Sequence, residues 1–159
     1  MTNLTGEYKC KVDAKGRISF PASLKKQLGE AVDFGFAVKR SVFETCLELY
    51  PLKEWEKITH DIFKLNRFVR KNDAFIRRFT AGVTHTELDG VGRLLVPRNL
   101  ADTAGLGKEI VLFASGNRIE LWDSDTYELW LKNEVGDFGG LAEEVMGGIN
   151  PDPDNGSVS

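Results

Sequence analysis

Two kinds of hydrophobic pattern occur together near the start of the chain. Polar and apolar residues alternate over 8–12 and 17–20, which predicts two strands joined by a tight turn as a hairpin. Leu24 and Leu28 recur at helical spacing, and Gly29 then provides a typical helix end. The expected elements are strands at 8–12, 17–20, 34–40 and 46–50, with a helix at 22–28 before the third strand.

The same order of patterns returns 76 residues later. The second set of expected strands covers 84–88, 93–97, 109–115 and 118–122, with a helix ending at Ala104-Gly105. When Asp13 is aligned with Asp89, identical residues coincide at Gly6/Gly82, Gly16/Gly92, Arg17/Arg93, Pro21/Pro97, Leu24/Leu100 and Gly29/Gly105. The sequence therefore contains two repeats, 6–58 and 82–131. Because neither has enough apolar faces to be stable alone, we expect them to cover each other's open edges and to share one core.

Helical patterns also occupy the segments outside the repeats. A helical connector at 59–81 carries apolar residues among many charges, and Asn72 marks an expected break in it. After the second repeat, 124–138 predicts a closing helix. Residues 132–159 comprise the end of this helix and a tail. We predict that the tail is disordered from Gly147, because it is rich in Gly, Pro and Asp and lacks apolar periodicity.

Charge is distributed unevenly along a chain whose net charge is only −3. Residues 1–80 contain 16 Lys and Arg against 10 Asp and Glu, a balance of +6. Residues 81–159 contain 5 against 14, a balance of −9. This asymmetry favours contact between the first half and a polyanion, although the acidic tail accounts for part of it.

The composition favours a cytoplasmic protein without a membrane partner. No apolar run approaches the ~18 residues of a membrane-spanning helix. The first ten residues lack the charged start and apolar stretch of a secretory signal. Cys10 and Cys46 lie far apart in strand-like segments, and we expect both to be reduced.

The sequence contains no catalytic or metal-binding constellation. His60 and His85 fall in different predicted elements, without Cys, Asp or Glu at metal-ligand spacing. Residues 102–105 read Asp-Thr-Ala-Gly, as in aspartic proteases, but that chemistry needs two carboxylates and the matching segment 26–29 contains none. Phosphate-binding loops and nucleophile elbows are also missing. We therefore predict a protein that is not an enzyme and that uses no metal, cofactor or small-molecule substrate.

Each repeat places an Asp four residues before an Arg, at the turn between its first two predicted strands. In the first repeat these are Asp13 and Arg17, and the simplest interpretation is a surface ion pair that braces the turn. Lys9, Lys11 and Lys15 favour a second interpretation, because they would make the hairpin a basic ribbon narrow enough for the DNA major groove. Asp13 would then orient the Arg17 guanidinium so that it offers two donors to guanine or to a phosphate.

These features together resemble the MraZ family, bacterial transcriptional regulators made of two SpoVT/AbrB-like domains. The resemblance covers about 6–131. It rests on the paired DxxxR turns, the GRIxxP continuation of the first turn, YPLKEWEKI at 50–58, FTAG at 79–82 and RIELWD at 118–123.

The resemblance implies a β-rich α+β fold in which the two AbrB-like halves form one swapped-hairpin β-barrel with flanking helices, assembled into a homo-oligomeric ring. It also implies nucleoid localisation and binding to repeated sequences in the double-stranded promoter DNA of the cell-division and cell-wall operon, usually as a repressor. The DNA-contacting motif of the family falls on Asp13 and Arg17 in the first repeat and on Asp89 and Arg93 in the second.

The second turn differs from the first in its surroundings. It contains Gly90-Val91-Gly92, and the three lysines of the first repeat are replaced by His85, Glu87 and Val91. We therefore expect Arg93 to contribute less to DNA binding than Arg17.

Three alternatives stay open at this stage. The connector cations are either further phosphate contacts or a solvated helix face or subunit contact; they are Lys64, Arg67, Arg70, Lys71, Arg77 and Arg78. The chain could instead be a ring-forming scaffold or partner-binding module in which the turns only brace the fold. It could also be an AbrB-type antitoxin, although such antitoxins usually carry a single barrel half and a toxin-binding tail.

Overall fold

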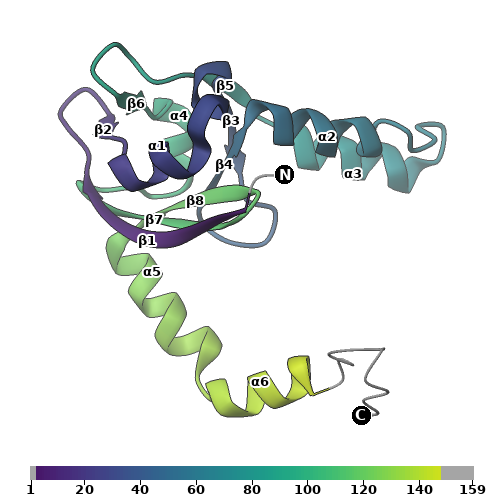
Figure 1. Ribbon diagram of the computed structural model, residues 1–159. Coiled ribbons are helices and arrows are strands. Elements are labelled where there is room, and N and C mark those ends of the chain that lie inside the picture. The colour runs from purple at the N-terminus through teal and green to yellow at the C-terminus, as the bar shows by residue number, and fades with distance from the viewer. Residues whose placement is uncertain (1–2, 148–159) are drawn as a thin grey trace, which may run out of the picture. The chain divides into compact units, whose positions relative to one another are not determined.

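The computed structural model describes residues 3–147, except for the side chain of Val135. The chain divides into two compact units, residues 1–124 and 125–159. The first unit contains β1 (Leu4–Lys11), β2 (Arg17–Ser19), α1 (Ala22–Leu28), η1 (Gly29–Phe34), β3 (Phe36–Arg40), β4 (Leu47–Pro51), α2 (Leu52–Ile62), α3 (Arg70–Thr80), β5 (Thr84–Thr86), β6 (Arg93–Leu95), α4 (Arg98–Thr103), β7 (Glu109–Gly116) and β8 (Arg118–Asp123). The fold is α+β, with antiparallel sheets and several helices (Figure 1).

The two repeats are joined by exchange of strands. The large sheet has the order β1-β7-β8-β4-β3-β5. In this sheet the first strand of each repeat pairs with the third strand of the other repeat, β1 with β7 and β5 with β3. The short strands β2 and β6 pair with each other in a separate two-stranded ribbon. Each repeat therefore supplies one edge strand of the large sheet, and that strand pairs with a strand of the other repeat.

Strand register shows that the two repeats are related by an approximate two-fold axis. In the ribbon, Ile18 lies opposite Leu94, which is its own equivalent at a separation of 76 residues. In the centre of the large sheet, Glu48 lies opposite Glu120, its equivalent at a separation of 72. Equivalent residues face each other at both places because the axis passes between them.

Two details of the sequence-based fold need correction. The first predicted hairpin is incomplete, because β1 and β2 are joined only by the single bridge between Val12 and Ile18, while β2 pairs along its length with β6. A closed barrel is also not formed by the described strands, which make an open six-stranded sheet and a two-stranded ribbon. Because β2 pairs with β6 of the other repeat, it does not pair along its length with β1 as a hairpin within the first repeat would require.

One hydrophobic core draws on both repeats. Its members include the equivalent pairs Ile18 and Leu94, and Leu24 and Leu100, all of which are buried. Leu24 and Leu28 both point inward from α1, as their spacing predicts, and α1 ends at Leu28. Figure 1 shows α1 and α4 on the same side of the large sheet as the β2–β6 ribbon. Because apolar side chains from both repeats fill this one core, the repeats must fold together.

The connector at 59–81 contains the end of α2 and all of α3, and the two helices are separated at residues 63–69. The predicted break at Asn72 is wrong, since Asn72 lies within α3 and its amide donates a hydrogen bond of 3.0 Å to the Asn66 carbonyl. The two helices meet where the rings of Trp55 and Phe79 stack at 5.7 Å. They project together from the sheets (Figure 1).

The second unit is helical over its described part. It contains most of α5 (Ser124–Trp130), a π-helical stretch at Leu131–Val135, and α6 (Phe138–Met146), whose N-cap Asp137 accepts a hydrogen bond from the Gly140 amide. The α6 helix has no counterpart among the predicted elements. The predicted disordered tail lies almost entirely outside the described residues. None of the helices between residues 3 and 147 is long and apolar enough to cross a membrane.

Candidate nucleic-acid interface

The first DxxxR turn is closed by a single carboxylate. One oxygen of Asp13 accepts hydrogen bonds from the backbone amides of Lys15 and Arg17, both at 2.9 Å. Its other oxygen accepts a hydrogen bond of 2.8 Å from Arg17 Nε. Gly16, at a φ of 83°, completes the turn with a backbone bond to the Asp13 carbonyl. The Asp thus fixes both the loop and the guanidinium.

The second turn repeats this geometry. Asp89 accepts hydrogen bonds from the amides of Val91 and Arg93 at 3.0 and 2.9 Å, and from Arg93 Nε at 2.8 Å. Gly92 has a φ of 81° and bonds to the Asp89 carbonyl. The Asp–Arg bracing expected from the sequence is therefore present in both repeats. In both, the guanidinium binds its Asp through Nε, which leaves the donors of its two terminal nitrogen atoms for a ligand.

The electrostatics of the two turns are matched as well. Backbone and side-chain hydrogen bonds from Arg17 hold the pKa of Asp13 below its ordinary value, and Arg93 does the same for Asp89. In each case the largest cause is the backbone amide of the Arg. Both carboxylates are therefore ionised at neutral pH and hold their arginines as pre-oriented cations.

Pairing of β2 with β6 brings the two arginines onto one surface. Arg17 lies opposite Leu95 and Arg93 lies opposite Ser19, while the buried residues Ile18 and Leu94 point to the other side. Arg17 and Arg93 are therefore diagonal neighbours on the outer face of the ribbon, a relation that places residues about 7–8 Å apart. Sequence reasoning assigned each Arg to its own hairpin and did not predict this proximity.

The two turns also hold each other in place. The Gly92 carbonyl accepts a hydrogen bond of 3.0 Å from the Phe20 amide, and the Gly16 carbonyl accepts one of 2.9 Å from the Val96 amide. Each turn is thus tied to the strand exit of the other repeat. Rigid support of this kind favours pre-organised binding.

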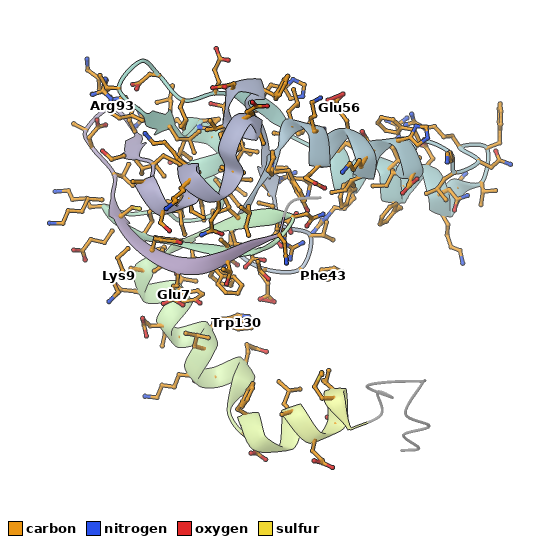
Figure 2. The ribbon with its side chains drawn as sticks, in the orientation of Figure 1. Glu7, Lys9, Phe43, Glu56, Arg93 and Trp130 are labelled. Atoms are coloured by element: carbon orange, nitrogen blue, oxygen red, sulfur yellow. The ribbon has the colours of Figure 1, made fainter. Side chains whose placement is uncertain are left out.

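The lysines predicted beside Arg17 occupy two places. Lys9 and Lys11 share the exposed face of β1, as the alternation predicts, and Glu7 lies on the same face. Lys15 is exposed within the first turn. Figure 2 shows Lys9 well apart from Arg93, so Lys9 and the second turn belong to separate parts of the surface.

Two cations beside the turns were missed by sequence reasoning, because each comes from the opposite repeat. Arg98, at the start of α4, borders the same hollow as the first turn and Lys15. Lys25, from α1, reaches the second turn so closely that a side chain added at Gly92 would collide with its ammonium group. The hollow at the second turn is also lined by Asp33 and Glu87. The first turn therefore has the more positive surroundings.

The connector cations have mixed environments. Arg67 and Arg77 both pair with Asp73, at 3.1 and 2.8 Å, and these bonds lower the pKa of Asp73. Lys64 lies 3.8 Å from Asp61 in an exposed pair. Three of the six cations therefore have carboxylate partners within the helical connector itself, which favours the interpretation of a solvated helix face for these three.

Other classes of site find no support in the described part of the chain. Residues 3–147 contain no group of three or more His, Cys, Asp and Glu that could hold a metal ion. His60 and His85 are both exposed. Cys10 and Cys46 are free thiols, and burial raises the pKa of each. The paired turns are the feature that repeats with the same geometry in both halves.

Comparison with known proteins identifies the family. A family model described as "MraZ protein, putative antitoxin-like" matches residues 4–78 and again residues 79–138. A relative from Flavobacterium psychrophilum is 56% identical, with 96% of this chain and 97% of the relative covered. Relatives from Christiangramia forsetii and Cytophaga hutchinsonii are 54% and 40% identical, with 92% and 89% of this chain covered and 95% and 93% of the relatives. All three are named transcriptional regulator MraZ. The chain belongs to the MraZ family.

Proposed function

We propose that this protein is a transcriptional regulator that binds promoter DNA in a sequence-specific manner through its two DxxxR turns. The observation that carries the proposal is the pair of arginines on the β2–β6 ribbon, each anchored through Nε by an Asp at 2.8 Å. An anchored guanidinium can present its remaining donors to a guanine edge or a phosphate without losing further side-chain freedom. A two-stranded ribbon is also narrow enough for the major groove.

In this proposal the repeats 6–58 and 82–131 each supply one turn, and the connector 59–81 separates them. Asp13 and Asp89 position Arg17 and Arg93, which make the base or phosphate contacts. Lys9, Lys11 and Lys15 add cations near the first repeat and strengthen attraction to the DNA backbone. The protein acts as a non-enzymatic repressor of the promoter of the division and cell-wall operon, and it associates with the nucleoid.

The proposal includes assembly of several subunits into a ring. Five large apolar residues of the connector are exposed, and they are Phe63, Leu65, Phe68, Val69 and Phe75. An exposed apolar cluster of this kind is typical of a protein–protein contact. A ring would repeat the paired turns, so that several sites on one promoter are bound at once. Binding of the second site is then intramolecular, and avidity exceeds single-site affinity by ~10²–10⁴.

The experiment is a gel-shift titration with the DNA upstream of the protein's own gene. Unrelated DNA of equal length provides the control, and the number of repeated sites is reduced stepwise to one. Light scattering on the same samples follows assembly. We expect specific binding that weakens steeply as sites are removed while the protein stays oligomeric. Equal affinity for the unrelated DNA, or binding of one site as tightly as several, would contradict the proposal.

The description of the matching family model as antitoxin-like favours a second candidate, a module that binds a partner protein. In that case, or in a ring-forming scaffold, the DxxxR turns only brace the fold. Failure to bind any duplex DNA at low salt would favour this second class.

A further inference from the structure

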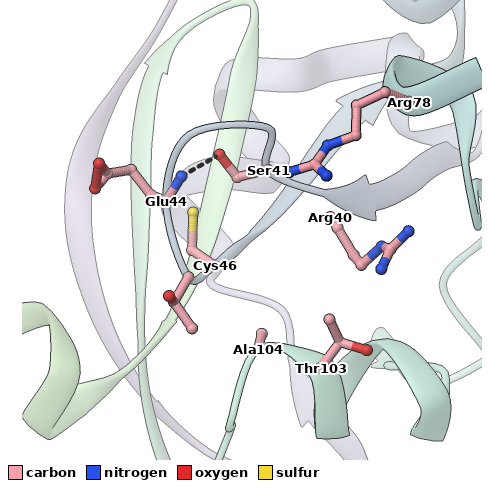
Figure 3. A pocket seen from close by; sticks show the side chains of 8 residues that line it. Arg40, Ser41, Glu44, Cys46, Arg78, Thr103 and Ala104 are labelled. Carbon is pink, nitrogen blue, oxygen red and sulfur yellow. Dashed lines mark hydrogen bonds between the residues drawn. The ribbon is translucent and has the colours of Figure 1, made fainter. Parts of the chain in front are cut away.

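A small polar pocket lies between the β3–β4 connection, α3 and the end of α4 (Figure 3). Its volume is about 180 Å³, the space of about six water molecules at ~30 Å³ each. Arg40 enters it from the end of β3, and Arg78 enters it from α3. Figure 3 shows both side chains beside the pocket, with the Arg78 guanidinium directed toward Ser41. The pocket is unrelated to the paired turns, because none of the residues that line it belongs to either turn.

Within the described part of the chain, neither Arg40 nor Arg78 has a carboxylate as an ion-pair partner. Neither forms an ion pair with any carboxylate among residues 3–147, and Arg78 makes only a long hydrogen bond of 3.5 Å to the Val42 carbonyl. The neighbouring Arg77 differs, because Asp73 binds it at 2.8 Å. Glu44 also borders the pocket, but Figure 3 shows its carboxylate turned away from both guanidinium groups. Two cations that line one pocket repel each other, and a bound anion would relieve this repulsion.

The remaining lining residues are neutral, and three of them carry hydroxyl groups: Ser41, Thr45 and Thr103. The Ser41 hydroxyl oxygen accepts hydrogen bonds from the amides of Phe43 and Glu44, and its side chain also hydrogen-bonds to Cys46, so Ser41 is held at the start of the loop. Cys46 is buried at the base, and burial raises the pKa of its thiol, so it adds no negative charge. Glu44 is therefore the one carboxylate among the residues that line the pocket, and it points away from both guanidinium groups.

We propose that this pocket binds a small phosphate-bearing ligand, held by Arg40 and Arg78. Two planar guanidinium forks match the several oxygens of a phosphate group better than they match a single point acceptor. The volume admits a phosphate group and a small substituent. The ligand would occupy a surface between the sheet and α3, and would tie the helical connector to the β3–β4 loop.

The test uses inorganic phosphate as the probe, without DNA. Thermal unfolding of the full chain is followed at increasing phosphate and constant ionic strength, with chloride as the reference anion. We expect a saturable rise in the unfolding temperature with phosphate for the wild type. Arg40→Gln and Arg78→Gln should each weaken the apparent phosphate affinity by about tenfold or more, because each removes a charge-assisted contact. Arg77→Gln is the matched control on the same helix and should behave like the wild type.

Two outcomes would overturn the proposal. One is a phosphate response that is absent in the wild type or equally weakened in all three variants. The other is a loss of DNA affinity in Arg40→Gln and Arg78→Gln measured without phosphate, which would assign the pocket to the DNA backbone. Because phosphate binding is measured in the absence of DNA, its failure leaves the proposed regulatory function untouched.

Discussion

Removal of each arginine in turn should weaken DNA binding by different amounts. Arg17→Ala and Arg93→Ala each delete one anchored guanidinium, and a bidentate base contact is worth ~1–3 kcal/mol. That range corresponds to a loss of about 5- to 150-fold in affinity. Both variants should fold normally, because backbone hydrogen bonds from residues 17 and 93 still close the two turns.

The structure favours a larger loss of DNA affinity for Arg17→Ala than for Arg93→Ala. Its turn lies beside Lys15 and Arg98, so DNA is already drawn toward it. The turn of Arg93 has Lys25 beside it, but Asp33 and Glu87 line the same hollow and offset that cation. We therefore expect Arg17→Ala to fall in the upper part of the range and Arg93→Ala in the lower part. An arginine that contacts a phosphate should also reduce the salt dependence, by ~0.9 in the slope of log K against log salt.

The assay is fluorescence anisotropy with labelled promoter DNA at several salt concentrations. Lys57→Ala is the control, since this cation is 64% exposed on α2, away from both turns, and its partner Glu54 lies on the same helix. Equal losses for the two arginine variants, or a larger loss for Arg93→Ala, would refute the reasoning from local charge. A loss as large for Lys57→Ala would show that only total charge matters.

Three further predictions concern the charged groups of the fold. Glu48→Ala should lower the free energy of unfolding by ~3–5 kcal/mol in urea titrations, because it removes the carboxylate 3.4 Å from the buried Lys39 ammonium, which then keeps only neutral partners such as the Arg40 carbonyl; a loss below ~1 kcal/mol would contradict this. In NMR titrations, Arg17→Ala should raise the pKa of Asp13 only partly toward its ordinary value, since the backbone amide is the largest cause of the shift; full recovery would show that the side chain dominates. Burial raises the pKa of Tyr50 to about 12, so its contribution to stability is complete below pH ~10 and is lost as the pH rises toward 12. Tyr50→Phe should remove this alkaline loss, and unfolding curves of wild type and variant that fall in parallel above pH ~10 would contradict the assignment.

The local elements were largely predictable because they depend on neighbouring residues. Alternation and turn chemistry located the strands, and Pro21 and Gly29 bound the first helix at both ends, as in the structure. The ion pair of Asp13 with Arg17 was also predictable, since a four-residue separation across a tight turn brings the two side chains together.

Strand partners were harder to predict, since strand pairing joins segments that are far apart in sequence. The alternation of apolar and polar residues in β2 is compatible with pairing to β1 as well as to β6. The observed pairing with β6 depends on the core that the two repeats share. The same exchange explains why Lys25 and Arg98 were missed, because each lies beside the turn of the other repeat. A search for cations in the helix of the opposite repeat could have found them. The α6 helix was missed although Phe138, Leu141 and Val145 recur at helical spacing, because the glycines at 136, 139 and 140 favour a loop at its start.

The most direct test of the account is a footprint of the protein on the DNA upstream of its own gene. Wild type and the double variant Arg17→Ala, Arg93→Ala are compared at equal concentration, after circular dichroism confirms that both are folded. The account predicts that the wild type protects a series of repeated sites and that the double variant protects none of them. Protection by the double variant equal to that of the wild type would contradict the central claim that the paired DxxxR turns bind the DNA.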